Sequence, residues 1–250
     1  MKLEKIIAAR TNKTVYRDGA EAIKVFDSDF SKSNILNEAL NQARAEETGL
    51  HVPKVLRVTD TDDGRWAIVS EYIEGKTLDR LMKENPDKFG EYLELMVELQ
   101  IKMHAKTAPL MNRMKDRFTR KIGECELAAT VRYDLLTRLE SMPKHNKVCH
   151  GDFCPENIII AKDGTPYILD WSHASQGNAS ADVARTYLLF WLNGNIDGAK
   201  KYLELFCKKS NTAKQYVQAW MPIVAAARLA SANAKEQEFL LSWVNVSDYE

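Results

Sequence analysis

Residues 150–157 read HGDFCPEN, and residues 168–171 read ILDW. Between the two motifs lie short β-type runs joined by the turn signal Asp163-Gly164, so the motifs flank a predicted β-hairpin. This order of elements brings three polar side chains to one end of adjacent strands: Asp152, Asn157 and Asp170.

The oxygen atoms of these three side chains suit phosphoryl transfer from ATP. Such a transfer needs an acceptor hydroxyl aimed in line at the γ-phosphorus, and counter-charge for the phosphate oxygens. The carboxylate of Asp152 is placed to accept a hydrogen bond from the acceptor hydroxyl. Magnesium prefers hard oxygen ligands, which Asn157 and Asp170 offer as an amide oxygen and a carboxylate. The pattern therefore predicts ATP and Mg²⁺ as cofactors.

The motifs resemble the catalytic core of the aminoglycoside phosphotransferase and choline kinase families. The family's Asp-hydrophobic-Ala step is matched by residues 182–184, DVA. Protein kinases carry Arg where this chain has Gly151, and Phe-Gly where it has WS at residues 171–172. The resemblance implies a two-lobed, protein-kinase-like fold with ATP and Mg²⁺ in the cleft between the lobes. It also implies a small molecule with a hydroxyl group as the acceptor.

The first third of the chain reads as strands with one helix. Predicted strands cover residues 14–17, 22–26, 52–56 and 66–69. A helix is predicted over residues 31–48, and its apolar face consists of Ile35, Leu36, Ala39, Leu40 and Ala43.

The pattern of apolar residues changes at Gly75, from strand-like to mainly helical spacing. Apart from the hairpin, most of the chain beyond it has helical periodicity. The sequence therefore predicts an α+β fold with a small strand-rich N-terminal lobe over residues 1–74 and a larger helical C-terminal lobe over residues 75–250.

A lysine in the N-terminal part extends the resemblance. Lys24 resembles the strand lysine that grips the α- and β-phosphates of ATP. Its partner in the family is a helix glutamate, followed by a glycine and a proline as Glu38 is followed by Gly49 and Pro53. Glu46 lies nearer the centre of the apolar stripe, whereas Glu38 lies at its edge, which suits a side chain that points into a cleft. We therefore expect Lys24 to pair with Glu38.

Two further segments bear on nucleotide binding. Residues 68–75 resemble the family's hinge between the lobes, where backbone groups near four residues would bind the adenine edge: Ser70, Glu71, Tyr72 and Ile73. In place of a glycine-rich loop over the phosphates, residues 9–14 contain no glycine. Side-chain donors, including the charge of Lys13, would then replace backbone N–H groups.

Composition narrows the possible partners. The 250 residues carry 35 basic and 35 acidic side chains, so the basic excess typical of nucleic-acid binders is absent and no nucleic-acid partner is expected. No stretch approaches the roughly 20 apolar residues of a membrane span, so no membrane partner is expected. The four cysteines lack CxxC spacing and indicate reduced thiols of a cytoplasmic protein.

Two other functions compete with small-molecule phosphoryl transfer. A silent nucleotide-binding regulator could share the fold, but it has no physical need to retain Asp152, Asn157 and Asp170. A protein kinase would need an Ala-Pro-Glu segment and a longer activation loop than the stretch after Asp170 allows. The acceptor stays open. Choline kinases tend to have a carboxylate where this chain has Ser172, which argues against choline.

Overall fold

The structure, a computed structural model, describes residues 3, 5–10 and 12–244, so Thr11 of the glycine-free segment lies outside the described residues. The chain divides into two compact units, each built from two stretches of sequence. Unit 1 comprises Met1–Phe89 and Pro155–Ala174, and unit 2 comprises Gly90–Cys154 and Ser175–Glu250. The lobe boundary expected near Gly75 stays a prediction.

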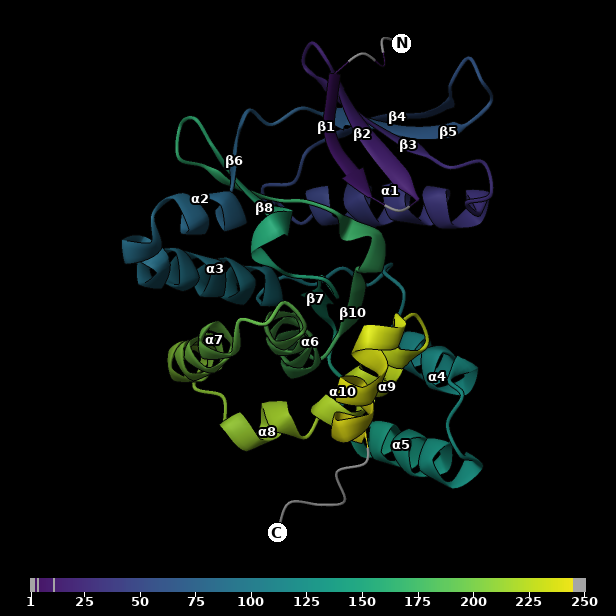
Figure 1. Cartoon of the computed structure of the whole chain (residues 1–250), viewed down its shortest axis with the longest axis vertical. Helices are drawn as coiled ribbons and strands as arrows, with labels where there is room; N and C mark the ends of the chain where they lie inside the picture. The colour runs from purple at the N-terminus through teal and green to yellow at the C-terminus, as the bar shows by residue number, and fades with distance from the viewer. Residues whose placement is uncertain (1–2, 4, 11, 245–250) are drawn as a thin grey trace. The chain divides into compact units, whose positions relative to one another are not determined.

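Unit 1 is built on an antiparallel five-stranded sheet in the order β1-β2-β3-β5-β4 (Figure 1). Its strands are β1 (Lys5–Arg10), β2 (Lys13–Asp18), β3 (Glu21–Phe26), β4 (Val55–Asp60) and β5 (Trp66–Glu71). The predicted hairpin joins β2 to β3. Gly19 makes its tight turn possible because its φ of +60° is a backbone conformation that favours glycine.

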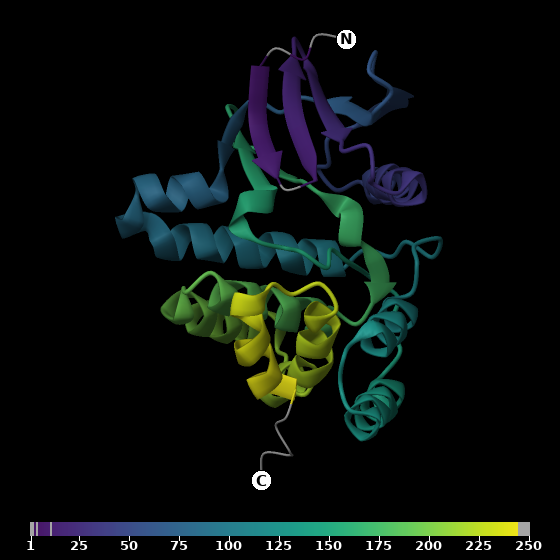
Figure 2. The same cartoon turned by 45° about the vertical axis from the view of Figure 1, so that its right-hand side comes forward.

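Different groups of residues pack on the two faces of this sheet. On one face, Ile23 and Val25 of β3 pack with Ala67 and Val69 of β5. On the other face, Phe26 and Ile68 pack against helix α1 (Lys32–Glu46), which lies beside the sheet in Figure 1 and is seen nearly end-on in Figure 2. Successive side chains of a strand alternate between faces, so Lys24 lies on the face that α1 covers.

The rest of unit 1 carries the predicted second hairpin. Strands β8 (Ile158–Ala161) and β9 (Pro166–Ile168) pair antiparallel, and β6 (Gly75–Thr77) adds a third strand beside β8. Short helices flank these strands: α2 (Leu78–Glu84), η1 (Pro86–Lys88), η2 (Pro155–Asn157) and η3 (Trp171–His173).

Unit 2 is mainly helical. Its helices are α3 (Phe89–His104), α4 (Met114–Glu124), α5 (Ala129–Ser141), α6 (Ala179–Leu192), α7 (Ile196–Ser210), α8 (Lys214–Gln218), α9 (Met221–Leu229) and α10 (Ala234–Val244). Two short strands, β7 (Lys147–Cys149) and β10 (Ser175–Gly177), pair antiparallel. Among the described residues, no helix combines the length and apolar character needed to cross a bilayer.

The predicted α+β fold class is confirmed, and two of the predicted elements differ locally from the structure. The strand expected over residues 52–56 begins at Val55 instead, because Pro53 has no N–H to donate to a sheet and its carbonyl accepts from the Gln42 side chain at 2.7 Å. The buried face of α1 is also rotated from the predicted one, since Leu36 and Leu40 are 44% and 46% exposed.

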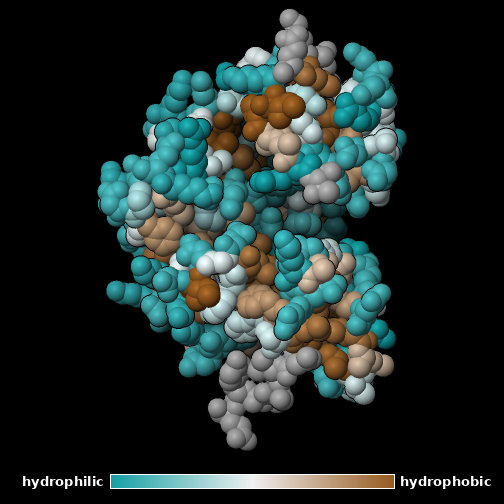
Figure 3. Space-filling model, viewed as in Figure 1, coloured by the Kyte–Doolittle hydropathy of each residue, from teal (hydrophilic) through white to brown (hydrophobic). Residues whose placement is uncertain are grey.

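Apolar side chains also reach the surface of unit 1 at strand β1. Ile6 and Ile7 of β1 are exposed, and Figure 3 shows brown apolar atoms over that part of the sheet. Such exposure fits an edge strand, which has only one neighbour in the sheet.

Candidate functional site

In unit 1, strand β3 and helix α1 bring the predicted pair together. The Nζ atom of Lys24 lies 2.5 Å from Oε1 of Glu38, which is only 3% exposed. A carboxylate so deeply buried needs a paired cation, because its isolated charge would be costly to remove from water. The structure therefore pairs Lys24 with Glu38, as expected from the sequence.

Asp170 joins this pair from the end of the β8–β9 hairpin. Its Oδ1 lies 3.4 Å from Nζ of Lys24. Burial opposes the charge of Lys24, but Asp170 and Glu38 more than offset that effect and raise the pKa of the ammonium group. Lys24 therefore stays protonated between two carboxylates, one from each of the two stretches of sequence that form unit 1.

The backbone of Asp170 has an uncommon conformation. Its φ of 58° and ψ of 66° lie in the left-handed region, which non-glycine residues rarely adopt. Such conformations cluster at functional sites, where the surrounding structure holds them in place. Here the N–H of Leu169, one residue earlier, donates to the Asn157 carbonyl at 2.8 Å. This bond sets Asn157 and Asp170 at one end of the hairpin, as the sequence predicts.

The predicted adenine-binding residues lie at and just beyond the end of β5. Ser70 and Glu71 are the last two residues of that strand. The N–H groups of Glu71 and Tyr72 donate to the carbonyls of Lys54 and Ala20 at 2.9 and 2.8 Å. Those two N–H groups are thus engaged within the protein, whereas their carbonyls and the neighbouring backbone of Ile73 remain as candidates for contact with a base.

In unit 2, Asp152 has an arginine as its direct partner. Nη2 of Arg185, on α6, lies 3.2 Å from Oδ1 of Asp152, and its Nε donates to the Gly151 carbonyl at 3.4 Å. Burial and the repulsion of Arg185 lower the pKa of a second guanidinium, that of Arg117, to about 10. Asp152 therefore lies close to two guanidinium groups.

Asp182, the first residue of the predicted Asp-hydrophobic-Ala motif, holds the loop that carries Asp152. Oδ1 of Asp182 accepts from the Gly151 N–H at 2.6 Å, and its Oδ2 lies 2.9 Å from Nε2 of buried His104. The Asp152 N–H in turn donates to Nδ1 of His150 at 3.2 Å. Although burial opposes ionisation, the bonds from His104 and Gly151 lower the pKa of Asp182.

We expect Asp182→Asn to destabilise the protein by about 3 kcal/mol, because it leaves the buried hydrogen-bond network of His104 and Gly151 incomplete. Since the folded-state pKa is lowered, the carboxylate stabilises the fold fully above its ordinary value of 3.8, and this contribution is lost as the pH falls through the folded-state value. Denaturant unfolding followed from pH 7 to pH 3 should therefore show a shallower decline for Asp182→Asn than for the wild type. Equal slopes would contradict the role of this carboxylate.

The exposed Asp134 of α5 provides the matched control. Asp134→Asn makes the same chemical change on the surface, so its free energy of unfolding should stay within about 0.5 kcal/mol of the wild type.

Arg185 is expected to position Asp152. Removing the guanidinium in Arg185→Ala frees the Asp152 side chain, so we expect kcat to fall about 10- to 100-fold while KM for the nucleotide changes less than about twofold. Arg185→Lys keeps the charge without the planar fork and should restore part of the loss. Steady-state kinetics with Arg120→Ala, which removes an exposed arginine of α4, give the control. A higher KM for the nucleotide with an unchanged kcat would contradict the positioning role.

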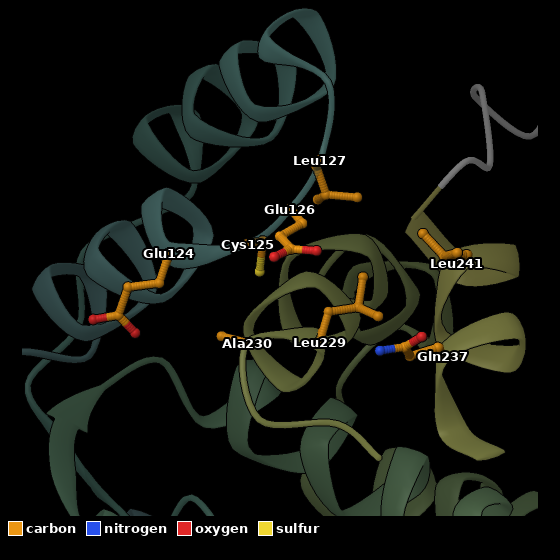
Figure 4. A pocket seen from close by; sticks show the side chains of 8 residues that line it. All are labelled: Glu124, Cys125, Glu126, Leu127, Leu229, Ala230, Gln237 and Leu241. Carbon is orange, nitrogen blue, oxygen red and sulfur yellow. The ribbon is translucent and has the colours of Figure 1, made fainter. Parts of the chain in front are cut away.

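A cavity of about 350 Å³ lies elsewhere in unit 2 (Figure 4). Cys125, Glu126 and Leu127 line it from the segment after α4, facing Leu229 and Gln237 from the α9–α10 region. None of the predicted site residues lines this cavity, so we assign it no part in the chemistry.

The structure shows contacts of two further residues that the sequence did not predict. Lys13 contacts Asp170 in unit 1, and Arg185 contacts Asp152 in unit 2. The spacing of Asp182 and Arg185 was a signal for the second, because residues three apart share a helix face and α6 is otherwise mainly apolar. For Lys13, the available signal was its place directly after a turn without glycine.

Solved structures share this fold. The apo form of a thermostable mutant of aminoglycoside phosphotransferase APH(4)-Ia is 14% identical, with a TM-score of 0.69 over 96% of this chain and 92% of that chain. Choline kinase LicA from Streptococcus pneumoniae is 15% identical, with a TM-score of 0.65 over 98% and 93%. A choline/ethanolamine kinase family protein from Mesorhizobium loti is 17% identical, with a TM-score of 0.57 over 99% and 83%. The expected kinase-like fold is thus confirmed.

Other crystals of the APH(4)-Ia mutant hold AMP-PNP with hygromycin B, or ADP with hygromycin B. None of the curated proteins compared matches the chain. The model of the phosphotransferase enzyme family matches residues 5–220, which is most of the sequence. The enzyme class expected from the motifs, a small-molecule kinase, is confirmed by this match. The chain belongs to the phosphotransferase enzyme family.

Proposed function

We propose that this enzyme transfers the γ-phosphate of ATP, in a magnesium-dependent reaction, to a hydroxyl group of a small molecule. The observation that carries the proposal is the contact of Lys24 with both Glu38 and Asp170. It joins a strand lysine, a helix glutamate and a hairpin aspartate in the arrangement that phosphoryl transfer from ATP requires. The complexes of APH(4)-Ia with AMP-PNP or ADP support a nucleotide as the donor.

Asn157 and Asp170 would hold the magnesium ion. Their amide and carboxylate oxygens are the ligands that Mg²⁺ prefers, and the Leu169–Asn157 backbone bond keeps them at one end of the hairpin. Asp170 also attracts two ammonium groups within 3.5 Å, so cations are favoured at this position. The donor set therefore fits magnesium, which when bound would neutralise charge on the phosphate oxygens.

Lys24 and Glu38 would position the α- and β-phosphates. The short contact to Glu38 fixes the ammonium group, while its remaining N–H donors can turn to phosphate oxygens. The backbone of Ser70, Glu71, Tyr72 and Ile73 would bind the adenine edge. A backbone carbonyl has two acceptor lone pairs, so these carbonyls could accept from the base even where the N–H groups are already bonded.

Asp152 would accept the hydrogen bond of the acceptor hydroxyl and so aim its oxygen at the γ-phosphorus. Nη2 of Arg185 bonds Oδ1 of this carboxylate and holds its orientation. A carboxylate held in this way reduces the freedom that the acceptor must lose before reaction.

Transfer of label from γ-labelled ATP to a panel of small alcohols tests the proposal. Because Arg185 contacts Asp152 and Arg117 interacts with it electrostatically, the panel should contain anionic and neutral alcohols as well as the cationic aminoglycosides and choline. We expect magnesium-dependent transfer to one acceptor class. Magnesium-dependent ATP binding with no transfer to any class would favour the silent nucleotide-binding regulator instead.

A further inference from the structure

Lys13 lies at the start of β2, directly after the glycine-free turn. Its backbone is fixed on both sides, since it pairs with Arg10 of β1 and Phe26 of β3. The Asn12 carbonyl, one residue earlier, accepts from the Asp27 N–H at 3.1 Å. The side chain is 19% exposed, so it is directed mostly into unit 1.

The principal ion-pair partner of the Lys13 ammonium group is Asp170. Its Nζ lies 3.1 and 3.3 Å from the two carboxylate oxygens of Asp170, but 3.9 Å from Glu38. Lys24 has the opposite preference, at 2.5 Å from Glu38 and 3.4 Å from Asp170. Each lysine therefore has its own principal carboxylate, and Lys13 is the one held by the predicted metal ligand.

These two roles of Asp170 compete. A carboxylate that ligates a divalent cation gives its oxygens to that ion, and a neighbouring ammonium group is repelled by the same charge. Lys24 would keep Glu38 as its partner, whereas Lys13 would lose its principal partner. A partly buried ammonium group then requires another anion, and the phosphate chain of the nucleotide supplies one.

We infer that Lys13 is a second phosphate-binding lysine, held by Asp170 in the structure and transferred to the nucleotide phosphates when Asp170 ligates magnesium. The inference rests on the proposed function, because it takes the metal and nucleotide from there. Lys13 thereby supplies, with one side chain, the positive donors that a glycine-rich loop supplies through its backbone N–H groups.

Two affinities measured on Lys13→Met test this inference, because they should change in opposite directions. Without Lys13 as a competitor, Asp170 should bind Mn²⁺ alone more tightly, which the electron paramagnetic resonance signal of free Mn²⁺ reports. Binding of MgATP, measured by calorimetry, should weaken about 10-fold because a charged hydrogen bond is lost. Lys13→Arg should restore part of the MgATP affinity.

Lys76→Met is the matched control, since Lys76 is an exposed lysine of the same unit that pairs with Glu84. It should change neither affinity by more than about twofold, as befits an exposed ion pair. If Lys13→Met weakens both affinities, Lys13 merely supports the fold and the inference is wrong. Unchanged MgATP affinity would overturn it as well. Failure of the wild type to bind MgATP would overturn the proposed function first, and this inference with it.

Discussion

Asp152→Asn should bind MgATP as the wild type does and yet transfer phosphate about 10²- to 10⁴-fold more slowly. The amide has nearly the same shape as the carboxylate. It lacks the negative charge that makes the hydrogen bond from the acceptor hydroxyl strong. Calorimetry would report the nucleotide affinity, and initial rates with the best acceptor would report the transfer.

Asp163→Asn provides the comparison for this variant. Asp163 lies in the exposed β8–β9 turn, where its side chain accepts from the nearby Thr165 N–H at 2.9 Å. This control should transfer phosphate at nearly the wild-type rate. If Asp152→Asn keeps more than about a tenth of the wild-type rate, another group orients the acceptor.

Asp170→Asn should abolish the increase in ATP affinity that magnesium produces. The substitution leaves one amide oxygen but removes the negative charge that a divalent cation requires most. The substitution also removes the negative charge that Asp170 presents to Lys13 and Lys24. Both ammonium groups can then interact with the phosphates of metal-free ATP. ATP binding without magnesium should therefore persist or strengthen.

Calorimetric titration of ATP with and without Mg²⁺ separates these effects, again with Asp163→Asn as the control. A full magnesium effect in Asp170→Asn would mean that the ion is held elsewhere. Weaker binding under both conditions would instead indicate that the variant disturbs unit 1 as a whole.

The hairpin and its flanking motifs could be predicted from the sequence because the signals are local. The turn at Asp163-Gly164 lies between two apolar runs, and the register that follows sets Asn157 opposite Leu169. The pairing of Lys24 with Glu38 came from the family's spacing of Glu, Gly and Pro. The structure gives it a physical reason, since Lys24 lies on the sheet face that α1 covers.

The face of α1 could not be predicted from its apolar residues. The helix buries Glu38, Asn41 and Gln42 while Leu36 and Leu40 stay exposed. Glu38 and Gln42 are buried because they have polar partners, Lys24 and the Pro53 carbonyl. Periodicity counts hydrophobic residues and contains no information about partners that lie elsewhere in the sequence.

The short strands were missed for a different reason. Strands β6, β7 and β10 have three residues each, and an alternating pattern cannot be recognised over so few positions. Lys13 and Arg185 were not assigned as site residues because each owes its place to a carboxylate far along the chain. Asp170 lies 157 residues from Lys13, and Asp152 lies 33 residues from Arg185.

The most direct test of the proposed function is the formation of a phosphorylated acceptor by three proteins in parallel, with magnesium titrated at fixed ATP. We predict a product in the wild type whose yield rises with magnesium, and almost none in Asp152→Asn or Asp170→Asn. ATP binding should nevertheless be retained in Asp152→Asn. Equal product from the wild type and either variant, or transfer that is independent of magnesium, would contradict the function proposed for this enzyme.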